Sequence, residues 1–401
     1  MHSSLFRTAL VLGLLSAIGP FSIDMYLPAL PEIGADLGVT ETQVQLTITM
    51  YFLAFGVSQF IWGPMADAYG RKLPLILGIS LFAVGSVGCA LAPTLGWLVA
   101  ARFVQGIGGA AVGVVPRAIV RDRYTGIEAT RLMALVMLVI AISPMLAPLA
   151  GSVVLAFGGW RLIFGVLVAV AAMSLMVTLF GLTETLARKD RVPVNFRSMA
   201  SGCRVLVGDP VFMGLTFVGA FGFGSFFVFI ASASFVYTEH FGLSPTGFSL
   251  AFALNALGFF AASQAAAPLG QRLGLLFSMR MALIGFAVSS LALLAVTLAG
   301  FGTLPVLMGF LFVANAFLGL VMPATFVMAL EEHGDIAGLA SSLGGTLQMV
   351  TGGLLVTLLG PFFNGTPLPM VAAIALCSVL ALGIGLAVLR RMSAPAMAAG
   401  E

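Results

Sequence analysis

The stretch LVLGLLSAIGPFSIDMYLPALP, residues 10–31, decides the fold class of this chain. It is an apolar run long enough to cross the hydrocarbon core of a bilayer as one helix, which takes about twenty residues. Its single carboxylate belongs to Asp24. A lone carboxylate inside a membrane-spanning helix costs about 2.5 to 3.5 kcal/mol on insertion scales. The stretch therefore predicts a membrane-spanning helix in which Asp24 has a functional role.

The composition of the whole chain is that of a membrane protein. Of its 401 residues, 60% are hydrophobic and 8% are charged, whereas charged residues make up about a quarter of a typical soluble domain. The formal net charge is +3, but the basic residues are scattered through short loops, which disfavours nucleic acid as a partner. The three cysteines are far apart in the chain and predict neither a disulfide framework nor a metal site.

Apolar runs of about twenty residues predict twelve membrane-spanning helices. Lipid offers no hydrogen bonds to an exposed backbone, so runs this long and this apolar have to be helical, and the predicted fold is all-α and polytopic. The predicted spans are 8–28, 45–63, 74–92, 97–118, 132–156, 160–182, 211–236, 247–269, 277–299, 304–328, 338–361 and 368–389.

The distribution of Lys and Arg predicts the orientation of these spans. When both termini are placed in the cytoplasm, sixteen of the eighteen basic residues lie on the cytoplasmic side, and only Arg102 and Arg161 do not. Cytoplasmic loops of membrane proteins carry the excess of Lys and Arg. We therefore predict a multi-pass protein with both termini in the cytoplasm.

The longest polar interval, residues 184–210, separates six predicted spans from six. It predicts a cytoplasmic linker between an N-terminal bundle, residues 1–183, and a C-terminal bundle, residues 211–401. A degraded internal repeat favours the same division into two pseudo-symmetric six-helix bundles. At a constant offset of 204, the repeat pairs Pro64, Asp67 and Gly70 with Pro268, Gln271 and Gly274.

The segment GPMADAYGRK, residues 63–72, is a short loop in this prediction and the most specific motif in the chain. Gly70 permits a tight backbone turn. Asp67 is predicted to accept hydrogen bonds from helix N-terminal amides, and Arg71 is predicted to pair with an acid on a neighbouring loop. The alternative is an ordinary basic loop that only marks topology.

Asp24 and Arg102 are the only two ionisable residues well inside the predicted spans. Charges inside a membrane almost always face the bundle interior and mark pathways or proton relays, and these two are of opposite sign. The alternative is a static ion pair that holds two helices together. Gln105 follows Arg102 by one turn, and the small residues within 106–111 let another helix approach closely.

The pattern G-x-x-x-D-x-x-G-R-K in residues 63–72 resembles the loop between helices two and three of the major facilitator superfamily. Many members carry Arg directly after the Asp, where this chain has Ala68. The chain resembles, more narrowly, the Bcr/CflA drug-resistance transporters in the segments DMYLPALP at 24–31, RFVQGIGG at 102–109, VRD at 120–122 and SPMLAPLAG at 143–151. The last segment departs from the antiporter pattern at Ala147, where Gly is usual.

The resemblance implies proton-coupled efflux of drugs and antibiotics across the bacterial inner membrane, by alternating access between the two bundles. It implies that Asp24 and Arg102 couple proton and substrate movement. It also implies a cytoplasmic gate that is closed only in the outward-facing state, with Asp67 facing the start of helix eleven near residues 337–342. The gate residues are Gly63, Asp67, Gly70, Arg71 and Asp122, and the helix-five motif is Pro144, Pro148 and Gly151.

Uncharged polar residues in or beside the spans are candidates for the substrate pocket, although each is also suited to an interhelical hydrogen bond. Pro144 and Pro148 are expected to bend helix five, either as part of a cavity wall or gate or as a packing kink without a moving role. The pocket candidates are Tyr26, Tyr51, Gln59, Gln105, Asn255 and Gln348.

No P-loop, H-E-x-x-H or G-x-S-x-G motif is present, so ATP-driven transport and hydrolysis within this chain are disfavoured. We expect a monomeric transporter that is not an enzyme and has no cofactor or metal, with small amphipathic drugs, protons and the bilayer as partners. Two alternatives remain. A proton-linked symporter importing a small organic solute would call for more charged or polar residues in the spans. A polytopic enzyme or receptor would call for reactive side chains clustered at one depth.

Overall fold

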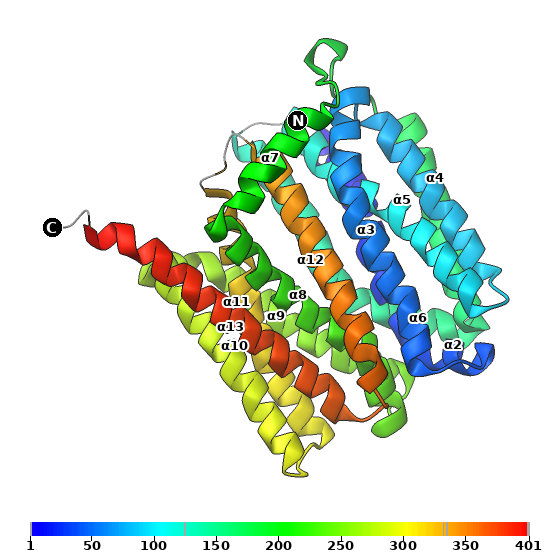
Figure 1. Cartoon of the computed structure of the whole chain (residues 1–401). Coiled ribbons are helices and arrows are strands. Elements are labelled where there is room, and N and C mark those ends of the chain that lie inside the picture. Colours follow the sequence, from blue (N-terminus) through cyan, green and yellow to red (C-terminus); the bar gives the residue numbers. More distant parts are fainter. Residues whose placement is uncertain (1, 124–125, 332, 334–335, 399–401) are drawn as a thin grey trace. The chain divides into compact units, whose positions relative to one another are not determined.

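The chain contains helices and no strand over the residues that the structure describes, which are 2–123, 126–331, 333 and 336–398. Figure 1 shows this computed structural model. Eleven of the described helices are long and apolar enough to cross a membrane. The prediction of an all-α polytopic fold is therefore confirmed.

The helix α6 (Gly126–Met176) accounts for two of the twelve predicted spans. Its backbone leaves the helical region at Gly158 (φ −163°, ψ 24°) and at Gly159 (φ 70°, ψ −178°). Only glycine adopts a positive φ at little cost, so a side chain at Gly159 would strain this turn. The predicted spans 132–156 and 160–182 are thus two helices joined by a glycine kink.

The chain divides into two compact units, residues 1–195 and 196–401. The first contains α1 (His2–Asp24), η1 (Leu27–Ala29), α2 (Leu30–Leu37), α3 (Glu41–Tyr69), α4 (Lys72–Ala90), α5 (Leu95–Arg123), α6, η2 (Val177–Gly181) and η3 (Arg188–Asp190). The second contains α7 (Phe196–Gly208), α8 (Pro210–Phe235), η4 (Val236–His240), α9 (Pro245–Leu273), α10 (Leu275–Leu298), α11 (Leu304–Glu331), α12 (Ala337–Leu359), η6 (Gly360–Phe362) and α13 (Pro367–Ala398).

The first helix breaks at the carboxylate that the sequence singles out. α1 ends at Asp24, and the short turn η1 then leads into α2. Pro28 explains the break, because it lacks the N–H that would bond the Asp24 carbonyl and its ring would clash with that carbonyl in a continuous helix. The first candidate membrane span, Val11–Leu37, includes the end of the predicted span 8–28, but its helix is broken there, and Asp24 lies at a helix C-terminus.

The segment 63–72 is mostly helical, which corrects its prediction as a loop. α3 continues through Pro64 to Tyr69 and α4 begins at Lys72, so only Gly70 and Arg71 connect them. The helix is prolonged because a backbone near the membrane has few partners other than its own turns, and Pro64 removes only one of those hydrogen bonds. Gly70 has φ 92°, the left-handed conformation that favours glycine.

The internal repeat is present in the backbone. α3 runs from 41 to 69 and α9 runs from 245 to 273, so both ends of the two helices are displaced by the predicted 204 residues. Each helix is followed by a glycine with positive φ, which is 92° at Gly70 and 86° at Gly274. The two units therefore repeat the same helix and the same turn, although Gln271 and Leu275 stand in the second unit where the first has Asp67 and Arg71.

The first unit is packed around α5, which contacts both α3 and α4 (Figure 1). A Cβ added to Gly106 would lie 2.6 Å from the carbonyl oxygen of Tyr51 in α3. One added to Gly108 would lie 2.3 Å from the backbone nitrogen of Phe82 in α4. Small residues allow helices in lipid to pack backbone against backbone. The predicted close approach at 106–111 is confirmed.

The interval predicted as a linker contains a helix that the sequence analysis did not predict. α7 packs on α8 and α12 of the second unit (Figure 1). Its Leu206 is buried against Phe212 and Ala340. α7 is too short for a membrane span, so a search for long apolar runs passes over it. Residues 184–195, in contrast, belong to the first unit.

Candidate functional site

Asp24 and Arg102 are both buried in the first unit. Asp24, at the end of α1, is 3% exposed, and Arg102, on α5, is 0% exposed. Their surroundings are joined through α1, because the Nη1 group of Arg102 donates a hydrogen bond to the carbonyl of Ser22 at 3.1 Å. Ser22 precedes Asp24 by two residues. The fold therefore places both ionisable groups next to the broken end of the first helix.

The guanidinium of Arg102 lies among aromatic rings. Its Cζ atom is 4.4 Å from the ring centroid of Tyr51, 4.7 Å from that of Tyr26 and 5.9 Å from that of Phe164. Each such contact contributes about 0.5 to 2 kcal/mol, more where water is excluded. Its Nη1 group also donates to Oε1 of Gln105 at 2.5 Å. Three predicted pocket candidates, Tyr26, Tyr51 and Gln105, thus surround this cation.

The charge of Arg102 has no anionic partner among the described residues. Its Nε and Nη2 groups have no hydrogen-bond acceptor, and among the described residues no carboxylate lies within 4.0 Å of the guanidinium. The static ion pair with Asp24, which was the alternative interpretation, is therefore not formed in this structure. An unpaired buried charge costs several kcal/mol.

Hydroxyl groups hold the two tyrosines in place. The hydroxyl of Tyr51 shares a hydrogen bond of 2.6 Å with the hydroxyl of Ser22. The hydroxyls of Tyr26 and Thr47 are 2.9 Å apart. Thr47 already donates to the carbonyl of Val44 at 2.6 Å, so Tyr26 is the donor in its own pair. Both rings are therefore anchored at their outer ends while their faces contact Arg102.

The helix-five motif lies on α6 and packs this helix against the break in the first helix. The backbone keeps helical dihedral angles at Pro144 and Pro148, so the predicted bend does not arise from a change of dihedral angle there. A Cβ added to Gly151 would lie 2.1 Å from the carbonyl oxygen of Met25. Gly151 thus allows α6 to contact the backbone immediately after Asp24.

We expect Gly151→Ala to lower the melting temperature of the purified chain. The new methyl group would meet a backbone oxygen that cannot rotate away, and overpacking of this kind costs about 1 to 3 kcal/mol. Gly165→Ala is the control in the part of α6 after the kink, because a Cβ at Gly165 meets only Leu162, at 3.9 Å. Equal melting temperatures for the two variants would contradict the close contact.

The other pocket candidates belong to α3 and to two helices of the second unit. Gln59 is half-buried on α3, about two turns beyond Tyr51. Asn255 is buried on α9, at the position that the repeat pairs with Tyr51. Gln348, on α12, lines a cavity within the second unit. Within the first unit, Gln59 forms no hydrogen bond with the described residues around the guanidinium.

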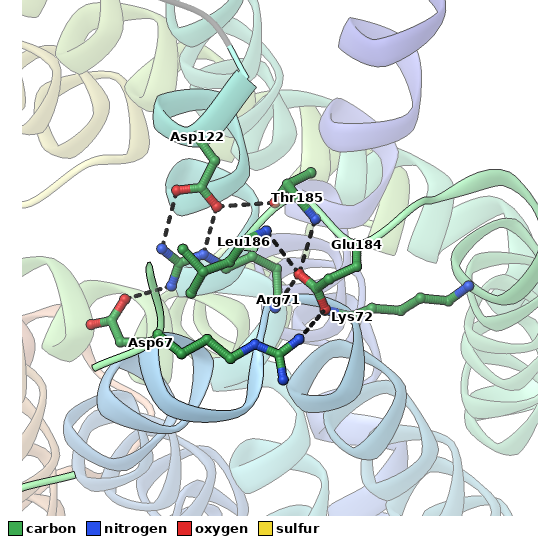
Figure 2. Close-up of polar contacts among 8 residues, drawn as sticks. Asp67, Arg71, Lys72, Asp122, Glu184, Thr185 and Leu186 are labelled. Atoms are coloured by element: carbon green, nitrogen blue, oxygen red, sulfur yellow. Dashed lines mark hydrogen bonds and ion pairs between the residues drawn. The ribbon is translucent and has the colours of Figure 1, made fainter. Parts of the chain in front are cut away.

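Arg71 is the centre of a second polar group, at the ends of α3, α4 and α5 (Figure 2). Its Nε and Nη2 groups donate to Asp122 at 2.8 and 3.1 Å, and its Nη1 group donates to Asp67 at 2.5 Å. The predicted pairing with an acid is confirmed, although Asp122 lies on the last turn of α5 and not on a loop. Burial lowers the pKa of Arg71, but the two carboxylates outweigh burial and raise it above its usual value.

The N-terminal amides of α4 are capped by Glu184, a contact that the sequence analysis did not predict. The predicted approach of Asp67 to the start of helix eleven stays a prediction. The Glu184 carboxylate accepts from the backbone N–H of Arg71 at 2.8 Å and of Lys72 at 3.2 Å. It also accepts from the two backbone N–H groups that follow it, at 2.9 and 3.1 Å. Asp67 lies on the preceding helix, where Arg71 four residues later engages its side chain.

The charge of Glu184 is favoured by these contacts. Partial burial raises the pKa of its carboxyl, but the backbone N–H donors outweigh burial and hold the pKa below its usual value of 4.5. A lowered pKa in the folded state stabilises the fold fully above the ordinary pKa, and this stabilisation is lost as the pH falls through the lower, folded-state pKa. At neutral pH the Glu184 contacts are therefore intact.

A third polar group, which the sequence analysis did not single out, ties α2 to the kink in α6. Asp36 accepts from the indole N–H of Trp160 at 3.0 Å and from Nη1 of Arg161 at 2.7 Å. Arg161 also donates to the carbonyl of Ala92 at 3.1 Å, and the backbone N–H of Trp160 donates to Glu32 at 3.2 Å. These contacts hold the segment that follows the broken first helix.

Other residues of the site also escape sequence reasoning. Ser22, Ser86 and Phe164 surround Arg102 and its partner Gln105, but serine inside a helix usually bonds its own backbone and gives no specific signal. Glu184 had a detectable signal, because it is an acid at the start of a polar interval whose next charges are mostly basic.

Comparison with known proteins places these elements in a family. A sequence model of the Major Facilitator Superfamily matches residues 12–356. The chain is 36% identical over 374 residues to the "Uncharacterized MFS-type transporter YdgK" of Bacillus subtilis, which covers 93% of this chain and 92% of that protein. It is 30% identical over 382 residues to the "Bicyclomycin resistance protein homolog" of Haemophilus influenzae, covering 94% and 95%. The solved D-xylose-proton symporter shares the fold, with a TM-score of 0.75 and 16% identity over 96% of this chain and 97% of that chain.

The family match covers most of the chain, from α1 into α12. The similarity to a bicyclomycin resistance protein homolog agrees with the narrower resemblance to Bcr/CflA-type transporters. Proteins of this family are membrane transporters and not enzymes. The chain therefore belongs to the major facilitator superfamily.

Proposed function

We propose that this chain is a proton-coupled exporter of small amphipathic drugs, including antibiotics, in the inner membrane of a bacterium. Membership of the superfamily makes it a multi-pass membrane transporter. The printed name of one relative, a bicyclomycin resistance protein homolog, supports a drug as the substrate. The bias of Lys and Arg supports cytoplasmic termini. The functional molecule in this proposal is a monomer.

The unpaired guanidinium of Arg102 is the observation that carries the proposal. Two of its N–H-bearing nitrogens have no acceptor in the described part of the chain, although the side chain is completely buried. Asp24 lies at the adjacent helix break and provides an anion when it is deprotonated. A protonated Asp24 needs no such partner, because a neutral carboxyl group is tolerated in apolar surroundings. The attraction between these residues therefore changes with the proton on Asp24.

This dependence on one proton provides the competition that antiport requires. In the inward-facing state Asp24 releases its proton to the cytoplasm and the site takes up drug. In the outward-facing state the drug leaves and Asp24 is protonated again. Because the proton gradient is directed inward, proton entry in this proposal drives drug export. Tyr26, Tyr51 and Gln105 contribute the wall of the site next to Arg102, and alternating access exposes that wall to each side in turn.

Antibiotic resistance in a bacterium that lacks its main exporters tests this function. We expect the expressed chain to confer resistance to bicyclomycin or to other members of a panel of amphipathic antibiotics. We expect the resisted drug to accumulate in cells once an ionophore collapses the proton gradient. Full expression in the membrane without resistance to any drug would contradict export, and gradient-driven uptake of a solute would indicate a symporter.

The Arg71 group, which consists of Arg71, Asp67 and Asp122, is the cytoplasmic gate in this proposal. The variant Asp67→Asn tests this role. The Asp67 side chain is 56% exposed, so its ion pair with Arg71 contributes only about 0 to 1 kcal/mol to stability. We expect a normally folded variant with a population shifted toward the inward-facing state and slower turnover. Distances between spin labels on the cytoplasmic ends of the two units, with Asp190→Asn as control, measure the shift. Label distances and turnover equal to those of the parent would reduce this segment to a topology signal.

A further inference from the structure

The first residues of the linker are fastened to the Arg71 group (Figure 2). The Glu184 carboxylate receives the two N-terminal amides of α4. The hydroxyl of Thr185 donates to Oδ2 of Asp122 at 2.9 Å, and the backbone N–H of Val192 donates to the carbonyl of Asp67 at 3.1 Å. We call residues 183–192 the linker latch. It contacts each of the three residues that form the ion pairs at this end of the helices.

Gly70 shows how closely the linker latch fits. A Cβ at Gly70 would lie 2.4 Å from Oε2 of Glu184 and 2.8 Å from Nη2 of Arg191. The glycine is therefore needed for the positive φ of the turn and also to admit the latch. Arg191 lies 4.0 Å from Glu184, so the latch places a guanidinium beside the motif of residues 63–72. Within that motif, this chain has Ala68 where many superfamily members carry Arg.

A short tether connects the linker latch to the second unit. Only residues 193–195 lie between the latch and α7, and α7 is packed on α8 and α12. Four Cα-to-Cα steps, from residue 192 to residue 196, span at most about 14 Å when fully extended. A displacement of α7 beyond that reach therefore has to pull on the latch.

We propose that Glu184 is a positioning residue that holds the linker latch on the Arg71 group, and that movement of α7 releases the latch through the tether. While the latch is closed, the backbone turn that carries Arg71 is fixed, and its guanidinium stays between Asp67 and Asp122. When the latch opens, the turn loses its cap and both ion pairs loosen. The transmission from α7 rests on the alternating movement proposed above, whereas the latch contacts do not.

Hydrogen exchange at the backbone amides of residues 71 and 72, in the full chain at pH 7, tests the latch without using transport. Glu184→Gln keeps the shape of the side chain but presents an amide in place of a carboxylate. We expect exchange at these two amides to become faster by about tenfold or more, because bonds to a charged acceptor are the strong ones. Glu184→Asp keeps the charge and is expected to restore part of the protection.

Asp190→Asn is the matched control, because it removes an exposed carboxylate from the same segment and is expected to leave the exchange unchanged. Exchange in Glu184→Gln equal to that of the parent would overturn the latch. Faster exchange throughout α3, α4 and α5 would show that Glu184 acts on the whole fold, and would overturn its role as a positioning residue.

Lengthening the tether tests the transmission. A Gly-Ser-Gly insertion between Val194 and Asn195 leaves every latch contact in place but gives α7 more reach. With a longer tether, movement of α7 no longer opens the latch. We therefore expect the insertion to slow hydrogen exchange at the backbone amides of residues 71 and 72. This change is opposite in sign to that of Glu184→Gln. Exchange unaffected by the insertion would overturn the transmission, whether or not the chain exports drugs.

Discussion

Asp24→Asn is expected to reduce drug resistance and gradient-driven efflux to the level of cells without the protein. The amide has nearly the shape of the carboxyl group but carries no titrating proton, so the competition between proton and drug is lost. The fold is expected to survive, because the Asp24 carboxylate is buried and, in the described part of the chain, forms no ion pair. Its melting temperature should therefore stay near that of the parent.

Efflux rate and thermal unfolding of the same preparation separate these effects for Asp24. Asp190→Asn, which changes an exposed acid of the linker, is expected to behave as the parent in both. Asp24→Glu keeps a titrating group at a slightly different reach, and we expect partial activity. Normal resistance from Asp24→Asn at equal expression would contradict a coupling role for this carboxylate.

Arg102→Ala is expected to abolish transport and also to destabilise the first unit. The substitution removes a completely buried side chain from contact with Tyr26 and Tyr51, and it leaves Oε1 of Gln105 without its donor. A buried acceptor without a partner costs about 1 to 3 kcal/mol, and the vacated volume adds to this cost. The loss of transport has a separate cause, because no cation remains to attract a deprotonated Asp24.

Arg102→Lys separates these two effects. Lysine keeps the charge but lacks the planar fork that reaches Ser22, Gln105 and the tyrosine faces together. We expect a folded variant with partial transport. Phe103→Ala is the control on the same helix, because this neighbour is 44% exposed whereas Arg102 is completely buried. Full transport by Arg102→Ala would show that the guanidinium is not part of the coupling mechanism.

The spans and the two buried charges could be predicted from the sequence because each depends on local composition. The cost of placing a charge in lipid applies residue by residue, so Asp24 and Arg102 are conspicuous within their apolar runs. The break after Asp24 could also have been predicted, since Pro28 excludes a continuous helix. The pairing of Arg71 with Asp122 could also be predicted, because both residues lie at the ends of neighbouring helices, next to short connections.

The linker contacts could not be predicted in this way. Glu184 caps amides that lie 113 and 112 residues earlier in the chain, and Asp36 meets Trp160 across 124 residues. No local pattern specifies which acid reaches which helix end. Such a contact forms only after the helices have packed, and their separation is set by glycines such as Gly108 and Gly151.

The sequence by itself therefore determined the all-α class, the spans, the repeat and the two residues that carry charge into the membrane, because hydropathy and charge act on each segment independently. Tertiary structure alone decided that Arg102 is surrounded by aromatic rings and not paired with Asp24, and that Glu184 caps α4. These outcomes depend on distances between helices, and the packing of small residues against neighbouring backbones sets those distances.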